Sequence, residues 1–148
     1  MWDMVDKFYH LNNDAERVDQ VFLNVGTNDI KNAWEGVGKL ESQVLKLVQH
    51  IKKLFPRATV LLISVLPMKL CKYYTARNFL QFNNILRYVS AITNSVFIDC
   101  FSNFLDNGDI GDRDINTRLF RDNLHLNKRG IGVFCVLFKN VINIYSKT

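Results

Sequence analysis

The sequence predicts an α/β fold built on a parallel sheet. A short apolar run at 21–25 has the β-branched and aromatic composition of a strand buried between two helical layers. An amphipathic segment and a second apolar run, 59–66, follow it, and strands joined in this way pair in parallel with a right-handed crossover. A further helical segment leads to a third run, 96–99. We therefore expect a three-layer α/β/α sandwich.

The first long helix is predicted between the runs 21–25 and 59–66. Asn32 and Glu35 stand at capping-box spacing before it, and Pro56 stops it. Its apolar residues recur at helical spacing on one stripe, which comprises Leu40, Val44, Leu47, Val48, Ile51, Leu54 and Phe55.

Three further helices are expected. A short amphipathic one spans 2–11, and Thr75 caps another that runs to Ile92. Asn127 caps the last helix. The side chains expected to face inward are Phe79, Phe82, Leu86 and Val89 in the second of these helices, and Val133, Val136, Leu137, Val141 and Ile144 in the last.

Composition suggests one globular domain over residues 1–148. The chain is 48% hydrophobic and 22% charged, and its formal net charge is +5. The segment 21–148 holds 17 basic and nine acidic residues, so it could contact phosphates, although a solvated basic surface is the ordinary explanation. No apolar stretch is long enough to span a membrane, and no signal peptide is visible. We expect an intracellular, cytoplasmic protein.

The three cysteines predict neither a zinc site nor a disulfide framework. Cys71, Cys100 and Cys135 are odd in number and widely spaced, so we expect reduced thiols, with Cys135 on an apolar helix face. The segment 107–112 has the composition of a calcium loop but lacks the terminal Glu that an EF-hand requires. We expect no metal and no cofactor.

Polar residues follow the first predicted strand directly. Gly26 allows a sharp turn, and Thr27, Asn28 and Asp29 place short polar side chains at the carboxyl end of the strand, where open α/β sheets bind ligands. An Asn amide in this position can stabilise a developing oxyanion. The same four residue types are also common in ordinary turns, where Asn and Asp side chains bond their own backbone.

A second polar segment precedes the last helix. Two residues separate Asp122 from His125, so their side chains can share one site. A carboxylate against one imidazole nitrogen selects the tautomer and leaves the other nitrogen free to act as a base. A loop histidine that only packs or caps would carry the same spacing.

In this order, the two segments resemble the SGNH (GDSL-type) hydrolase family. The segment 26–29 matches the family's third block, where the Asn is an oxyanion-hole donor. The segment 122–125 matches its fifth block, where Asp and His complete a Ser-His-Asp triad. The resemblance covers about residues 18–145. It implies a flavodoxin-like, SGNH-type sheet and a small acyl-ester or acetylated substrate. Similar domains occur as bacterial lipases, as acetyl-ester hydrolases and in open reading frame 1 of retrotransposons, and the basic, cysteine-containing chain favours the last.

The sequence departs from the family at the nucleophile. Family members begin with a strand that ends in Gly-Asp-Ser, and no such block occurs here. Ser42 falls in a predicted helix, and Ser64 lies in the middle of a predicted strand. We therefore expect an N-terminally incomplete domain that lacks its first strands and is inactive alone. The strand 21–25 would then be a hydrophobic edge through which chains self-associate.

Two functions remain open at this point. The chain is either part of an ester hydrolase whose serine lies elsewhere, or a noncatalytic remnant that binds an anionic partner such as RNA. RNA recognition normally needs stacked aromatic residues or a recognisable motif, and neither is visible, so the hydrolase ranks first.

Overall fold

The computed structural model of the protein describes residues 17–30, 36–68, 76–106 and 115–145. The chain forms two compact units. The first unit comprises Met1–Val65 and Arg77–Ile98, and the second comprises Leu66–Ala76 and Asp99–Thr148. The helix predicted at 2–11 lies outside the described residues.

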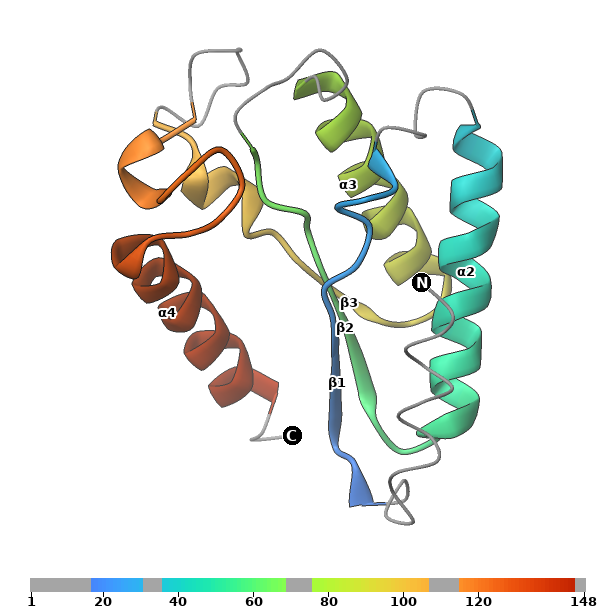
Figure 1. Ribbon diagram of the computed structural model, residues 1–148. Helices are drawn as coiled ribbons and strands as arrows, with labels where there is room; N and C mark the ends of the chain where they lie inside the picture. Colours follow the sequence, from blue (N-terminus) through green and yellow to red (C-terminus); the bar gives the residue numbers. More distant parts are fainter. Residues whose placement is uncertain (1–16, 31–35, 69–75, 107–114, 146–148) are drawn as a thin grey trace. The chain divides into compact units, whose positions relative to one another are not determined.

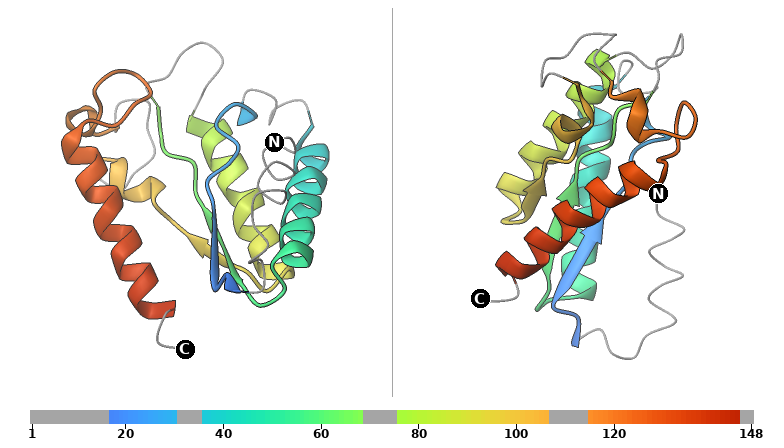
Figure 2. Two further views of the ribbon diagram at one scale, coloured as in Figure 1. Left: turned by 60° about the horizontal axis from the view of Figure 1, so that its bottom comes forward. Right: turned by 90° about the vertical axis from the view of Figure 1, so that its left-hand side faces the viewer.

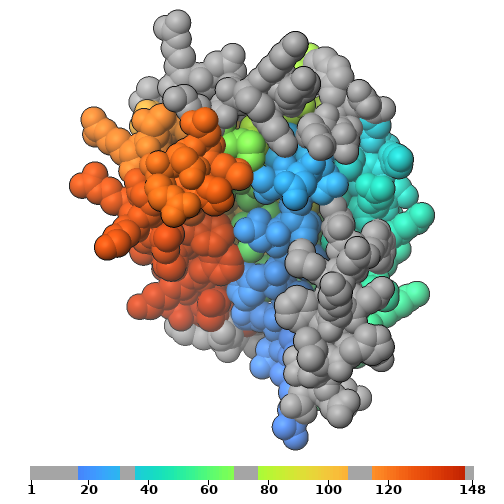
Figure 3. Space-filling model, in the orientation of Figure 1, coloured from blue at the N-terminus to red at the C-terminus, as the bar shows by residue number. Residues whose placement is uncertain are grey.

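The first unit contains a parallel sheet, which confirms the predicted α/β fold (Figure 1). Its strands are β1 (Gln20–Leu23), β2 (Thr59–Ile63) and β3 (Val96–Ile98), in the order β1-β2-β3. Apolar side chains of β2 are buried on both of its faces, as expected for a central parallel strand. Within the described sheet β1 is an edge strand, and Figure 3 shows the segment 17–30 at the surface.

Both long helices of this unit lie on one face of the sheet (Figures 1 and 2). Helix α2 (Val37–Leu54) connects β1 to β2, and α3 (Ala76–Ile92) connects β2 to β3. The two crossovers proceed in the same direction along the sheet, so right-handed connections place both helices on the same side. The predicted inward side chains are fully or almost fully buried at Leu40, Val44, Leu47, Val48, Ile51, Phe79, Phe82, Leu86 and Val89.

Helix α2 begins at Val37. Its N-cap is Gly36, which provides no side-chain hydrogen bond, and the predicted capping pair of Asn32 and Glu35 lies outside the described residues. The helix ends at Leu54, two residues before Pro56, as predicted.

Strands β1 and β2 end two and three residues earlier than predicted. The ladder between them stops at the pair of Leu23 and Leu62. Beyond β2, Ser64 N–H still donates to the Ile98 carbonyl, at 3.0 Å. The next residue, Val65, is bonded by a side chain instead of a strand: its N–H donates to Asn83 Oδ1 at 2.8 Å, and its carbonyl accepts from Asn83 Nδ2 at 3.3 Å.

The second unit is built from short turns and one long helix. Helices η3 (Phe101–Phe104), η4 (Thr117–Leu119) and α4 (Lys128–Tyr145) are its described helices. Antiparallel bridges join Leu105 to Ile115 and Phe120 to Leu126. The rings of Phe104 and Phe120 meet edge to face, with centroids 5.8 Å apart.

The predicted inward face of α4 is partly wrong. Val136 and Ile144 are 59% and 62% exposed, and Cys135 is exposed rather than packed on an apolar face. Phe134 and Phe138 are half-buried instead, with ring centroids 4.6 Å apart. Apolar side chains occupy more than half of the circumference of this helix, so helical spacing alone does not identify its inward side. In the described part of the chain, no helix is both long and apolar enough to cross a membrane.

Replacing Asn83 by alanine should destabilise the protein by about 2–5 kcal/mol. The substitution leaves the Val65 N–H and carbonyl without their partner in a buried position, and each such group costs about 1–3 kcal/mol. Asn84→Ala is the matched control, because Asn84 is exposed on the same helix and its replacement should change stability by less than about 0.5 kcal/mol. Urea denaturation of both variants measures the difference; equal midpoints would show that the Asn83 side chain does not stabilise the end of β2.

Candidate active site

The segment after β1 forms a tight turn around Gly26. The Gly26 carbonyl accepts from the N–H groups of Asp29, at 2.9 Å, and Ile30, at 3.1 Å. Ile30 is completely buried and anchors the end of the turn. Asn28 lies at the tip and is exposed, whereas Thr27 and Asp29 are half-buried. The turn therefore leaves Asn28 exposed above a hydrogen-bonded base that ends on a buried residue.

Helix α3 restricts which residue can stand at position 26. Gly26 has φ +105°, in the region that favours glycine. A Cβ atom built there would lie 2.1 Å from carbon atoms of the buried Phe82 ring. One turn of helix earlier, Asn78 Nδ2 donates to the Ile30 carbonyl at 3.5 Å. The turn thus packs directly against α3.

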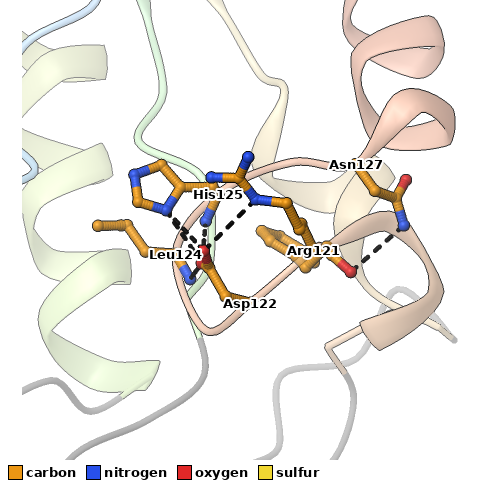
Figure 4. A network of polar contacts seen from close by, with 6 residues as sticks. Arg121, Asp122, Leu124, His125 and Asn127 are labelled. Atoms are coloured by element: carbon orange, nitrogen blue, oxygen red, sulfur yellow. Dashed lines mark hydrogen bonds and ion pairs between the residues drawn. The ribbon is translucent and has the colours of Figure 1, made fainter.

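In the second unit, Asp122 and His125 are in direct contact (Figure 4). Asp122 Oδ2 lies 2.8 Å from His125 Nδ1, and Asp122 Oδ1 lies 3.1 Å from the same nitrogen. A carboxylate accepts hydrogen bonds, so this contact places the imidazole proton on Nδ1 and leaves Nε2 with its lone pair.

The loop backbone also binds the Asp122 carboxylate. Oδ1 accepts from the N–H groups of His125, at 2.7 Å, and Leu124, at 2.8 Å. These backbone hydrogen bonds, together with the one from the His125 ring, hold the pKa of Asp122 well below its usual range. The carboxylate is therefore ionised at neutral pH and can support a positive charge on the ring. Arg121 Nε lies 3.7 Å from Oδ2.

Asn127 closes the loop that carries this pair. Its N–H donates to the Leu119 carbonyl at 3.0 Å, and its Nδ2 donates to the carbonyls of Arg118, at 2.7 Å, and Phe120, at 3.3 Å. As predicted, its Oδ1 caps α4 by accepting from the N–H groups of Arg129 and Gly130. The Arg121 N–H donates to the His125 carbonyl at 2.8 Å, which tightens the loop further.

Gly130 brings α4 close to η4. A Cβ atom at this position would lie 2.2 Å from the Leu119 carbonyl oxygen. Only glycine permits this approach without a shift of the backbone.

A cavity of about 210 Å³ is lined in part by Asp122. The residues that line it are Ile115, Thr117, Phe120, Arg121, Asp122 and Asn123. The pair itself is open to solvent, with the side chains of Asp122 and His125 47% and 60% exposed. Among the described residues, no three metal-binding side chains come together.

Gly26, Thr27, Asn28 and Asp29 thus form one turn of the first unit, and Asp122 and His125 form one contact of the second. Two contributions were not expected from the sequence. Arg121 lies beside the Asp122 carboxylate, and the Asn127 amide nitrogen bonds two carbonyls in addition to capping the helix. The sequence predicts that Asn127 caps a helix. It contains no pattern that predicts the turn which brings Arg118 and Phe120 next to the Asn127 side chain.

Three of the described serines and cysteines, Ser64, Ser90 and Cys100, are buried and poorly placed as nucleophiles. Ser102 Oγ donates to Asp99 Oδ2 at 3.0 Å. Burial, with the nearby Asp99 charge, raises the pKa of the Cys100 thiol to about 12, so it is not a thiolate at neutral pH. Cys71 lies outside the described residues.

Comparison with known proteins identifies the family to which this chain belongs. The model of the GDSL-like lipase/acylhydrolase family matches residues 3–131, and the chain belongs to that family. No curated protein matches the chain significantly.

Three solved structures illustrate the shared fold. A candidate platelet activating factor from Streptococcus pneumonia is 21% identical, with a TM-score of 0.71, over 84% of this chain and 60% of that one. A candidate GDSL-like lipase from Parabacteroides merdae is 16% identical, with a TM-score of 0.66, over 93% and 66%. A GDSL-like lipase from Bacteroides thetaiotaomicron is 19% identical, with a TM-score of 0.62, over 84% and 62%. The chain therefore spans 60–66% of the length of these structures.

Gly26→Ala should destabilise the protein by about 2–5 kcal/mol. The positive φ costs an L-residue about 1–2 kcal/mol, and displacement of the Phe82 ring costs about 1–3 kcal/mol more. Gly132→Ala is the matched control: Gly132 lies within α4 with no atom within 4 Å of a new Cβ, so this change should stabilise by up to about 1 kcal/mol. Thermal unfolding of both variants checks the signs, and a neutral Gly26→Ala would mean that the turn relaxes without cost.

The loop around Asp122 should keep its hydrogen bonds down to unusually low pH. Because the folded-state pKa is lower than the ordinary value of about 3.9, the carboxylate stabilises the loop at pH values above about 4. That contribution should decline only as the pH falls further, through the lowered pKa. The amide chemical shifts of Leu124 and His125, followed by NMR from pH 7 downward, measure the transition, and Asp122→Asn should abolish it. A midpoint near pH 4 in the wild type would contradict the assignment.

Proposed function

We propose that this chain carries the proton-transfer and oxyanion-binding groups of a Ser-His-Asp ester hydrolase, and that its substrate is a small acyl ester or acetyl ester. The single observation that carries the proposal is the contact between Asp122 and His125 Nδ1. With the proton held on Nδ1, Nε2 can remove a proton from a serine hydroxyl and return it to the leaving alcohol. The ionised carboxylate would stabilise the imidazolium that forms between these two steps.

Asn28 is proposed as the oxyanion donor. Its exposed amide stands on a turn that is anchored by Ile30 and by the close packing of Gly26 on Phe82. A donor held in this way needs no reorganisation when the carbonyl oxygen of the ester becomes negative, and such donors typically contribute about 10²–10³ in rate.

The nucleophile is proposed to come from sequence outside this chain. The chain contains no Gly-Asp-Ser block, and the described residues Ser64, Ser90 and Cys100 are buried. Membership of the family supports ester chemistry, and the chain spans only part of its structural relatives. On this proposal the chain alone is inactive, because loss of one triad member typically costs about 10⁴–10⁶ in rate.

The proposal predicts the behaviour of two proteins toward p-nitrophenyl acetate. The present chain should hydrolyse it no faster than its His125→Ala variant. A protein extended at the N-terminus by a family-type segment that ends in Gly-Asp-Ser should gain esterase activity. That activity should fall by about 10⁴ or more with His125→Ala and by about 10²–10³ with Asn28→Ala.

Asn140→Ala, on the exposed side of α4, is the control and should leave the activity of the extended protein unchanged. Two results would count against the proposal. If the present chain exceeds its His125→Ala variant a hundredfold, it contains its own nucleophile. If the extended protein is folded but its activity is unaffected by His125→Ala, the roles given to Asp122 and His125 are wrong.

A further inference from the structure

We infer that Asn127 is a positioning residue for the Asp122–His125 pair, in addition to the helix cap that its sequence position predicts. The inference rests on the proposed function, because it concerns the base of that reaction. It is carried by the hydrogen bonds of the Asn127 side chain, which join the segment that enters the loop to the first turn of α4.

The two ends of the Asn127 amide bind in different directions. Oδ1 accepts from the first turn of α4, at 2.9 Å from Arg129 N and 3.1 Å from Gly130 N. Nδ2 donates to the carbonyls of Arg118 and Phe120, on the chain that enters the loop. A helix cap needs only the oxygen, so the nitrogen contacts are not explained by capping.

These nitrogen contacts define where the loop begins and ends. Phe120 and Leu126 form an antiparallel bridge, and the five residues between them carry both Asp122 and His125. Asn127 follows Leu126 at the end of this loop, and its Nδ2 donates to the carbonyl of Phe120, the residue before the loop. One amide group therefore ties together the two ends of a short, largely exposed loop.

A loop this exposed has few packing contacts to fix its geometry. The side chains of Arg121, Asp122 and His125 are 70%, 47% and 60% exposed. Polar contacts must then set the separation of Asp122 from the His125 ring, and a shift of about 1 Å in such a pair can cost about a hundredfold in rate. Asn127 fixes the ends of the loop, and the Asp122 carboxylate organises its interior.

The exchange of Asn127 for aspartate separates the two roles. Asp caps a helix as well as Asn and is favourable at the positive end of the helix dipole. It has no amide hydrogens, so the carbonyls of Arg118 and Phe120 lose their donor. Asn127→Ser makes the same separation without adding charge, because a serine hydroxyl also caps well.

The experiment uses the full chain. The ring ¹⁵N chemical shifts of His125, recorded at neutral to slightly alkaline pH, give the tautomer of its imidazole. The thermal melting temperature measures folding. Asn140→Asp is the matched control, since it makes the same chemical change at an exposed position of α4. We expect Asn127→Asp to melt within about 3 °C of the control, which corresponds to less than about 1 kcal/mol for a domain of this size. The ratio of the Nδ1–H to the Nε2–H tautomer should fall by about fivefold or more. We expect this because release of the loop end weakens the Asp122–His125 hydrogen bond by about the value of one net hydrogen bond.

Two outcomes would overturn the inference. If the tautomer ratio in Asn127→Asp and Asn127→Ser equals that of the control, Asn127 is only a helix cap. If both variants lower the melting temperature well beyond the control and alter the spectra of α4 as a whole, the residue is structural rather than positioning.

Activity supplies a separate readout. In the serine-bearing extended protein, Asn127→Asp should lower kcat by about tenfold or more at unchanged KM, because it misplaces the base without touching substrate. If the extended protein has no His125-dependent activity, the proposed function fails, while the tautomer measurement on the present chain still decides the role of Asn127.

Discussion

The backbone of the central strand β2 has to be fully hydrogen-bonded, and this constraint sets the geometry of the first unit. β2 is buried on both faces and pairs on both edges, so water cannot reach its polar groups. The neighbouring strands form hydrogen bonds with these groups as far as Ile63. Beyond that point, the Ile98 carbonyl after β3 accepts from Ser64 N–H, and the Asn83 amide binds the backbone of Val65. Helix α3, which supplies that amide, also supplies the Phe82 ring that packs on Gly26. The end of the central strand and the turn that presents Asn28 are therefore set by one helix.

The second unit is held together differently, because Asp122 and His125 lie on an exposed loop that buries little area. The Asp122 carboxylate accepts from two backbone N–H groups and from the His125 ring, so one ionised group organises both the loop and the imidazole. Charge-assisted hydrogen bonds of this kind are stronger than neutral ones. They are also directional, so they hold the ring proton on Nδ1 and leave Nε2 free, as the proposed role of His125 as a base requires.

Helix α4 shows where apolar periodicity stops being informative. Its apolar residues cover most of the helix, with basic and amide side chains on a narrow arc. Val136 and Ile144 fit a helical repeat as well as Phe134 and Phe138 do, yet the first two are exposed and the two rings are half-buried against each other. In α2, lysines and glutamine mark the solvent side, and five of the seven residues of the predicted inward stripe are buried; Leu54 and Phe55, at its end, are half-buried. The difference lies in how sharply polar residues delimit the buried arc.

By itself, the sequence determined the order of elements, the parallel sheet, the faces of α2 and α3, the Asn127 cap and the two polar segments, because each depends on residues that are close along the chain or on a regular period. The end of β2 and the loop before α4 depended on contacts that no local pattern contains. Asn83 reaches Val65 across 18 positions of sequence, and the Asn127 amide reaches the Arg118 carbonyl across nine. Only the tertiary structure decided these contacts, because a side-chain amide can satisfy whichever backbone group the fold brings within about 3 Å.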